Sequence, residues 1–172
     1  MKIVTTPMCE EIVRLAGFTD YAVNKHPTIE DGDLAILLSE SKVEMDAILI
    51  KINTPKQVFE SIREVSKIAG KALSDDEILA FFEGYKLAKK YLNSNFERSI
   101  NVKVYSEFLK DIVLDVGFVI DSESFDYVIY PDYLKDNVTE IENLVEIPSH
   151  NSISKNPFEK IEVRYAILEN LI

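Results

Sequence analysis

The most informative feature of this sequence is an opening segment whose pattern recurs about a hundred residues later. Residues 2–18, KIVTTPMCEEIVRLAGF, place a short apolar stretch before a turn and a helix, and residues 102–118, VKVYSEFLKDIVLDVGF, repeat this pattern. The identical pairs are Val4/Val104, Ile12/Ile112, Val13/Val113, Gly17/Gly117 and Phe18/Phe118. Each segment leads to an apolar run that begins after an aspartate, Asp33 or Asp126. The repeated order of elements is stronger evidence for a duplication than the identities are.

Short apolar runs rich in β-branched residues, separated by helical patterns, predict an α/β fold. Over the first seventy residues strands and helices are expected to alternate, which favours a parallel sheet with right-handed crossovers. A capping box at Ser74-Asp75-Asp76-Glu77 predicts a helix to about Leu92, which buries Phe81, Phe82 and Tyr85 and is long enough to join two lobes.

We therefore predict two related Rossmann-like half-domains with mostly parallel sheets, joined by a long spine helix. The expected parts are a first half over 1–72, a connecting helix and hinge over 73–100, a second half over 101–148, and a polar loop with a docked C-terminal helix over 149–172. Two α/β halves of this kind usually hold a ligand in the cleft between them.

Composition excludes several functional classes. The net charge of −11 argues against nucleic acid as a partner, because phosphate contacts need clustered Lys and Arg. No apolar run approaches the roughly 18 to 20 residues of a membrane helix, and the N-terminus lacks the apolar core of a signal peptide, so we expect a cytoplasmic protein. One cysteine and two histidines predict no metal site. The five glycines are too scattered for a nucleotide-binding loop, and no pattern indicates a particular cofactor.

Candidate ligand-binding residues follow the ends of the predicted strands, because ligands of open parallel sheets bind beyond the carboxyl ends of the strands. The set is Thr5, Thr6, Met8, Cys9, Ser39, Glu40, Asn53, Ser106, Asp132 and His150. Thr6 and Pro7 predict a helix cap that turns the backbone N–H groups of Met8 and Cys9 toward the cleft. These hydroxyl, amide and carboxylate groups favour a neutral or cationic polar ligand over a polyphosphate.

Two of these residues could also serve an enzyme. Cys9 lies in the first turn of a predicted helix, where the helix dipole lowers a thiol pKa, although Glu10 and Glu11 oppose this effect. A small buried apolar residue is the more common role of such a cysteine. His150 lies in the polar loop PSHNSIS and could reach a cleft as a base, although surface histidines without such a role are more common. Asp132 and Glu107 could form a carboxylate pair, and solvated cap residues are the plainer interpretation.

Three stretches of the chain carry a resemblance to a known family. The opening KIVTTPMCEEIVRLAGF, the run DLAILLSES and the closing IPSHNSISKNPFEKIEVRY resemble the methanogenesis marker proteins of methane-producing archaea, the fifth-numbered marker in particular. The resemblance extends over nearly the whole chain and implies an accessory protein whose partners are methyl-coenzyme M reductase or its maturation proteins. It implies no reaction and no catalytic residues. Separately, the two-lobe pattern with a spine helix looks like helical-backbone solute-binding proteins and nitrogenase-type domains, which is an analogy of fold.

These observations lead to one functional hypothesis and two rivals. We expect a non-catalytic ligand-binding or assembly and maturation factor with a site between its lobes. The rival from another class is a small enzyme that uses Cys9 or His150 in the same cleft. The third is a structural subunit whose cleft is filled by its own side chains.

Overall fold

The computed structural model describes residues 1–149 and 151–172, and the chain divides into two compact units. The first unit consists of Met1–Ile52, Lys56–Glu83 and Lys155–Pro157, and the second consists of Asn53–Pro55, Gly84–Ser154 and Phe158–Ile172. Each unit contains one four-stranded sheet, and all neighbouring strands in both sheets are parallel. The predicted α/β fold with two Rossmann-like halves is confirmed.

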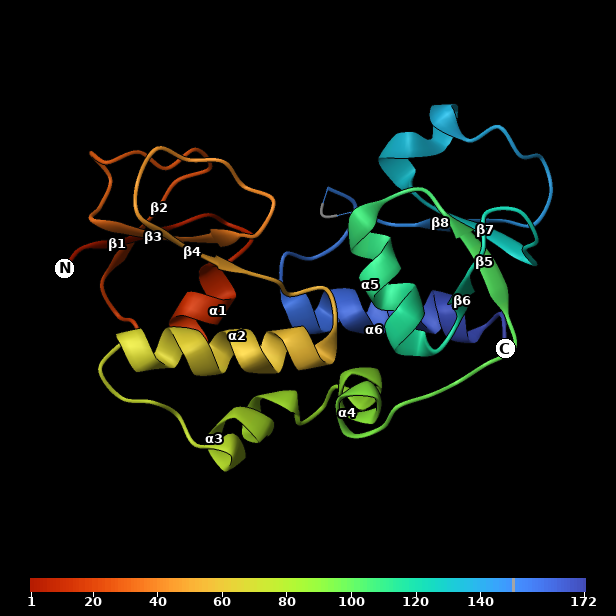
Figure 1. The fold of residues 1–172 in the computed structure, drawn as a ribbon. Helices are drawn as coiled ribbons and strands as arrows, with labels where there is room; N and C mark the ends of the chain where they lie inside the picture. Colours follow the sequence, from red (N-terminus) through yellow and green to blue (C-terminus); the bar gives the residue numbers. More distant parts are fainter. Residues whose placement is uncertain (150) are drawn as a thin grey trace. The chain divides into compact units, whose positions relative to one another are not determined.

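The first unit is built from four short strands and two helices that precede its connecting segment. They are β1 (Ile3–Thr5), α1 (Glu10–Leu15), β2 (Tyr21–Val23), β3 (Leu34–Leu38), β4 (Ala47–Ile50) and α2 (Pro55–Ile68). The strand order is β2-β1-β3-β4, and α1 and α2 lie on the same side of the sheet (Figure 1). The expected alternation of strand and helix is wrong between β2 and β4, where loops 24–33 and 39–46 connect the strands.

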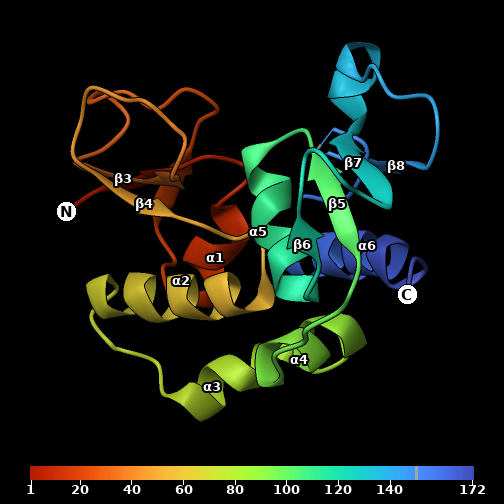
Figure 2. The ribbon, with the colours of Figure 1, turned by 45° about the vertical axis from the view of Figure 1, so that its right-hand side comes forward.

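The second unit repeats this plan after its first helix. Its elements are α4 (Lys86–Asn93), β5 (Asn101–Val104), α5 (Glu107–Val116), β6 (Val119–Ile120), β7 (Tyr127–Pro131), the 3-10 helix η2 (Asp132–Asn137), β8 (Leu144–Ile147) and α6 (Pro157–Glu169). The strand order β6-β5-β7-β8 corresponds position for position to β2-β1-β3-β4. The segment 132–143, coloured cyan to light blue, lies on the far side of β7 and β8 from α6 (Figure 2).

Hydrogen bonds show that the two units are built in the same way. The side chain of Asp33 accepts a bond from the backbone N–H of Lys2 at 2.7 Å, and that of Asp126 accepts one from Asn101 at 2.9 Å. After α1 and α5, the N–H of Phe18 bonds to the carbonyl of Val13, and the N–H of Phe118 bonds to that of Val113. The predicted repeat therefore extends to the order strand, helix, three strands, helix in each unit.

The strand register corrects one pair of the sequence alignment. Ile3 pairs with Leu34, the residue after Asp33, and Val102 pairs with Tyr127, the residue after Asp126. Val4 is therefore equivalent to Lys103, and the identity of Val4 with Val104 is a coincidence of spacing. The path from the strand to the matching helix positions is one residue longer in the second unit, from Val102 to Ile112, than in the first, from Ile3 to Ile12. The remaining four identities lie at equivalent positions in the helix or directly after it.

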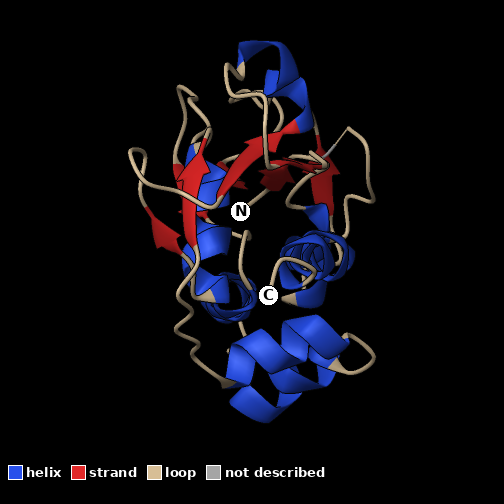
Figure 3. Ribbon diagram, turned by 90° about the vertical axis from the view of Figure 1, so that its right-hand side faces the viewer, coloured by secondary structure: helices blue, strands red, loops and turns tan. Residues whose placement is uncertain are grey.

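The predicted spine helix is wrong, because residues 74–93 form three short pieces (Figures 1 and 3). The helix α3 (Asp75–Leu79) is followed by the 3-10 helix η1 (Ala80–Phe82), and α4 begins only at Lys86. Glu83 and Tyr85 are extended, with ψ of 134° and 90°, on either side of Gly84. The capping box at Ser74 is present, but the weak helix former Gly84 interrupts the segment. Phe82 is buried, whereas Phe81 and Tyr85 are half-buried.

Candidate functional site

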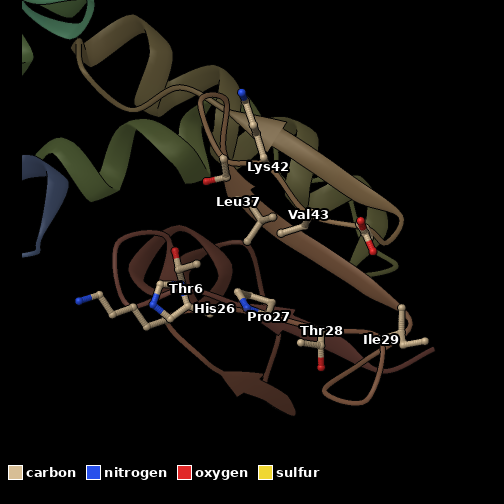
Figure 4. A pocket seen from close by; sticks show the side chains of 11 residues that line it. Thr6, His26, Pro27, Thr28, Ile29, Leu37, Lys42 and Val43 are labelled. Carbon is tan, nitrogen blue, oxygen red and sulfur yellow. The ribbon is translucent and has the colours of Figure 1, made fainter.

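A pocket of about 550 Å³ opens at the carboxyl edge of the first sheet (Figure 4). The chain leaves β1 toward β2 on one side and later continues from β3 to β4 on the other, so β1 and β3 flank the point where the strand order reverses. Ligands of open α/β sheets bind at this point. The lining residues are Thr6, Lys25, His26, Pro27, Thr28, Ile29, Leu37, Ser41, Lys42, Val43 and Glu44.

The centre of the pocket is apolar. Leu37, on β3, is fully buried and belongs to a small core cluster with Val4 and Ala35. Val43, from the loop after β3, packs against this cluster, and Figure 4 shows it beside Leu37. Pro27 on the opposite loop is also buried. The pocket therefore has a hydrophobic floor that is continuous with the core of the unit.

One wall of the pocket is an ordered loop held by the carboxylate of Asp31. Oδ2 of Asp31 accepts hydrogen bonds from the Thr28 backbone N–H at 2.7 Å, the Asn24 amide at 3.1 Å and the Thr28 hydroxyl at 3.2 Å. The backbone N–H of His26 in turn donates to Oδ1 of Asn24 at 3.0 Å. The Thr28 N–H, followed by the Asn24 amide, holds the pKa of Asp31 below its ordinary value. The wall that carries Lys25 and His26 is thus shaped by bonds within the loop.

The rim of the pocket is positively charged, in a chain whose net charge is −11. Lys25 and Lys42 form no ion pair with the residues that the structure describes. Glu44 is the single acid among the lining residues. Figure 4 shows the Lys42 side chain directed away from Leu37 and Val43, which places its ammonium group at the rim.

Of the residues predicted at the end of β1, only Thr6 lines the pocket. The Thr5 hydroxyl is buried and donates to the Ile36 carbonyl at 2.7 Å, so Thr5 ties β1 to β3. Cys9 is fully buried, and its N–H donates to the Thr6 carbonyl at 3.1 Å rather than facing a ligand. The expected helix cap at Thr6 is wrong: residues 7–9 form a turn and α1 begins at Glu10, after Cys9, which makes no side-chain cap. Met8 is half-buried in that turn.

The predicted residues after β3 and β4, namely Ser39, Glu40 and Asn53, do not line the pocket. The Ser39 hydroxyl bonds to the neighbouring Glu40 at 3.3 Å, and the Ser39 N–H donates to the Ile50 carbonyl. The Asn53 amide donates to Asp111 at 3.1 Å. In the loop that begins with Ser39 and Glu40, the residues that line the pocket are the next ones, Ser41 to Glu44.

The predicted residues of the second unit serve its own structure. Ser106 caps α5 by accepting a bond from the Leu109 N–H. Asp132 does not pair with Glu107, which instead pairs with Lys110 at 2.7 Å. Oδ2 of Asp132 accepts bonds from the Ser149 N–H at 3.1 Å and the Ser152 hydroxyl at 2.5 Å, so it anchors the polar loop that follows β8. His150 lies outside the described residues.

In the second unit, the positions equivalent to Thr6 and Val4 carry larger side chains, which bond to a shared carboxylate. The register makes Tyr105 equivalent to Thr6, and Lys103 equivalent to Val4. Lys103 donates to Glu140 at 2.5 Å, Tyr105 donates to the same carboxylate at 2.6 Å, and the Lys103 ammonium lies 6.0 Å from the ring centre of Phe125. These two hydrogen bonds lower the pKa of Glu140 to about 2. Glu140 comes from the loop 132–143, which is longer than its counterpart 39–46.

Sequence reasoning missed most of the pocket. The segment from His26 to Gly32 is polar, contains Pro27 and indicates a loop, which by itself suggests no binding role. Its position shortly after the three-residue strand β2 is the signal that points to the pocket. No signal in the sequence identifies Lys42 and Val43, because the loop they belong to folds back over the sheet.

Comparisons with known proteins add two distant structural likenesses. The chain matches no protein-family model and no curated protein. Over 99% of its length it is similar to the iron uptake ABC transporter substrate-binding protein PiaA from Streptococcus pneumoniae TIGR4, with a TM-score of 0.47, 10% identity and 91% of that chain covered. It is also similar to nitrogenase Cp1, with a TM-score of 0.43, 10% identity and 40% of that chain covered.

Two further findings concern the residues that the structure describes. Among them, no helix has the length and apolar character required to cross a bilayer. Within the same residues, no group of three or more His, Cys, Asp or Glu side chains is arranged to hold a metal ion.

Proposed function

We propose that this chain is a non-catalytic binding protein and that the pocket at the carboxyl edge of the first sheet receives a small molecule. The observation that carries this proposal is the difference between the two units. At equivalent positions, the second unit has Tyr105 and Lys103, both bonded to Glu140, whereas the first has the smaller Thr6 and Val4 and a pocket of about 550 Å³. This volume lies within the range typical of ligand sites, roughly 300 to 1,000 Å³.

The chemistry of the lining residues supports binding rather than catalysis. Nucleophilic catalysis by a hydroxyl or thiol needs a base within hydrogen-bond reach. No hydrogen bond among the described residues joins the His26 ring to the hydroxyl of Thr6, Thr28 or Ser41. Cys9, the thiol that an enzyme could use, is fully buried and does not line the pocket.

The link to methanogenesis, like the cytoplasmic location, stays a prediction that rests on the sequence. If the chain is an accessory protein of methyl-coenzyme M reductase, a tagged copy expressed in a methane-producing archaeon should co-purify with that enzyme or with its maturation proteins. The matched control is a tagged unrelated acidic protein of similar size. Equal recovery with both baits would contradict the link without affecting the pocket.

The pocket itself is tested by two neighbouring threonines with different roles. A fragment screen by amide chemical-shift perturbation on ¹⁵N-labelled protein should give shifts concentrated at residues 25–29 and 41–44. Thr6→Val should weaken binding of the best fragment about threefold to tenfold, the net worth of one hydrogen bond, with little change in the free energy of unfolding. Thr5→Val is the matched control: it leaves the Ile36 carbonyl without its donor and should cost about 1 to 3 kcal/mol of stability, with binding unchanged.

Either of two results would contradict the proposed site. One is a set of fragment shifts that falls elsewhere in the chain. The other is a Thr6→Val variant that binds the fragment as tightly as the parent protein does.

A further inference from the structure

We infer that the pocket takes a small organic acid, with its apolar part on Leu37 and Val43 and its carboxylate at the lysine rim. The inference rests on the proposed function and adds the chemical class of the ligand. It replaces the expectation of a neutral or cationic ligand, which considered only the hydroxyls, amides and carboxylates at the strand ends. The structure adds Lys25, Lys42 and His26 to the site.

The floor of the pocket selects for an apolar group. Leu37, Val43 and Pro27 form a surface that is continuous with the core cluster of Val4 and Ala35. Burial of apolar area there is favourable in proportion to the area removed from water. A fully hydrated ion such as inorganic phosphate gains nothing from such a floor, and the chain has no glycine-rich loop to surround a phosphate with N–H groups.

The rim selects for a negative charge. Elsewhere in the chain many cations are already paired, for example Arg63 with Asp75 at 2.6 Å and Lys90 with Glu169 at 2.6 Å. Lys25 and Lys42 come from the two loops that border the pocket, and neither has an ion-pair partner among the described residues. With His26 neutral, the lining carries two positive charges and the one negative charge of Glu44.

The apolar floor and the lysine rim contribute unequally to the affinity. Ion pairs with exposed lysines are individually weak, because water screens them and because long side chains lose conformational freedom. The apolar floor therefore supplies most of the affinity, and the lysines supply the preference for an acid. This division predicts a measurable difference between an acid and its neutral amide.

The test compares three probes at one ionic strength: 4-methylpentanoate, its neutral analogue 4-methylpentanamide, and inorganic phosphate. Binding is followed through the backbone amides of residues 25–29 and 41–44 in ¹⁵N-labelled protein. We expect the carboxylate to bind about fivefold more tightly than the amide, from two weak ion pairs. Phosphate should give no saturable shift at these residues. Raising the salt concentration should bring the carboxylate affinity toward that of the amide.

Substitutions of the two rim lysines test whether they cause the preference for the carboxylate over the amide. Lys25→Gln combined with Lys42→Gln should abolish the difference between carboxylate and amide and leave the amide affinity unchanged. Lys71→Gln is the control, because Lys71 belongs to the same unit, is exposed and does not line the pocket.

The outcomes separate this inference from the proposed function. If the amide binds at the pocket as tightly as the carboxylate, or the double variant keeps the preference, the organic acid is excluded and the binding site stands. If phosphate binds more tightly than the carboxylate, the apolar selection is wrong. Shifts that appear only away from residues 25–29 and 41–44 would overturn both.

Discussion

At the scale of single residues, three carboxylates hold the loops at the edges of the two sheets. Asp31 holds the loop after β2, Asp132 holds the loop after β8, and Glu140 lies against Lys103 and Tyr105 of the second sheet. Burial raises the pKa of Asp132, but bonds from Ser152 and Ser149 outweigh it and keep the pKa below its ordinary value. Each of these carboxylates is thus stabilised in its charged form.

Glu140 should make the stability of the protein depend on pH in a defined interval. Its pKa of about 2 in the folded protein lies below the ordinary 4.5, so its contribution is complete above the unfolded value and is lost as the pH falls toward about 2. The difference in unfolding free energy between the parent and Glu140→Gln, measured with urea, should be constant from about pH 8 to about pH 5 and narrow below that. A difference that stays constant down to about pH 3 would contradict this role.

The two glycines that end α1 and α5 form a matched pair with different surroundings. Both have positive φ, 108° at Gly17 and 95° at Gly117, a conformation that costs an L-residue about 1 kcal/mol. A Cβ added at Gly117 would lie 2.4 Å from the Phe96 carbonyl oxygen, whereas the nearest atom at Gly17 is 3.9 Å away. Gly117→Ala should therefore cost clearly more than Gly17→Ala in thermal or urea unfolding. Equal losses would mean that the backbone at Phe96 moves aside freely.

At the scale of elements, residues 74–93 consist of short pieces rather than one helix. Ser74 begins α3 with a complete capping box, and η1 follows directly, but the extended residues around Gly84 prevent the helix from continuing. The ring of Phe82 lies 6.3 Å from that of Phe59 on α2, and Asp75 at the start of α3 pairs with Arg63 of α2 at 2.6 Å. Contacts with α2 therefore hold the first part of this segment.

Phe82 should accordingly contribute strongly to the stability of this segment. Phe82→Ala removes a side chain that is only 1% exposed and should cost about 3 to 5 kcal/mol, the usual result of leaving a cavity at a buried phenylalanine. Phe81→Ala, at the half-buried neighbouring position, is the control and should cost much less. Urea unfolding of both variants checks the difference, and a loss under about 1 kcal/mol for Phe82→Ala would mean that the segment is not fastened to α2 in this way.

At the scale of the whole molecule, one plan is used twice with different outcomes. Both units order their strands in the same way around a central pair, β1 and β3 or β5 and β7. The edge strands each carry an exposed apolar residue, namely Val23, Leu49, Val119 and Leu144. The units differ in the strand residues Val4 and Lys103 and in the loops that follow the third strand of each unit, 39–46 and 132–143. These differences change the chemistry at the edge of the sheet.

This arrangement predicts the pattern of amide hydrogen exchange. The slowest amides should lie in the central strands of both sheets, and those of the edge strands β2, β4, β6 and β8 should exchange faster, because they are bonded on one side only. Exchange measured by NMR on the whole chain tests this. Uniformly fast exchange in β5 and β7 would show that the second sheet opens without the first and that the two are not equivalent in stability.

Much of the fold could be read from local patterns. The apolar runs of β1 and α5 predict strand and helix, because this periodicity acts through neighbours in the chain. The Gly-Phe pairs, Asp33 and Asp126 indicate the duplication, because each forms an equivalent hydrogen bond in its own unit. The prediction of a single spine helix is wrong because contacts between distant residues, and not local spacing, set the backbone there. The stripe of Phe81, Phe82 and Tyr85 has helical spacing, but packing against Phe59 and the break around Gly84 decided the backbone.

Local sequence patterns are sufficient to predict the fold class, the duplication and the place of Thr6 at the end of a strand, because strand and helix periodicity are local properties. Contacts between distant residues place Thr5 and Cys9 in the core, let Asp132 and Ser106 stabilise their own unit, and bring Lys25 and Lys42 to one pocket. The reason is physical: which side chains meet at the edge of a sheet depends on strand order and on how far each loop folds back, and neither is encoded in the spacing of residues along the chain.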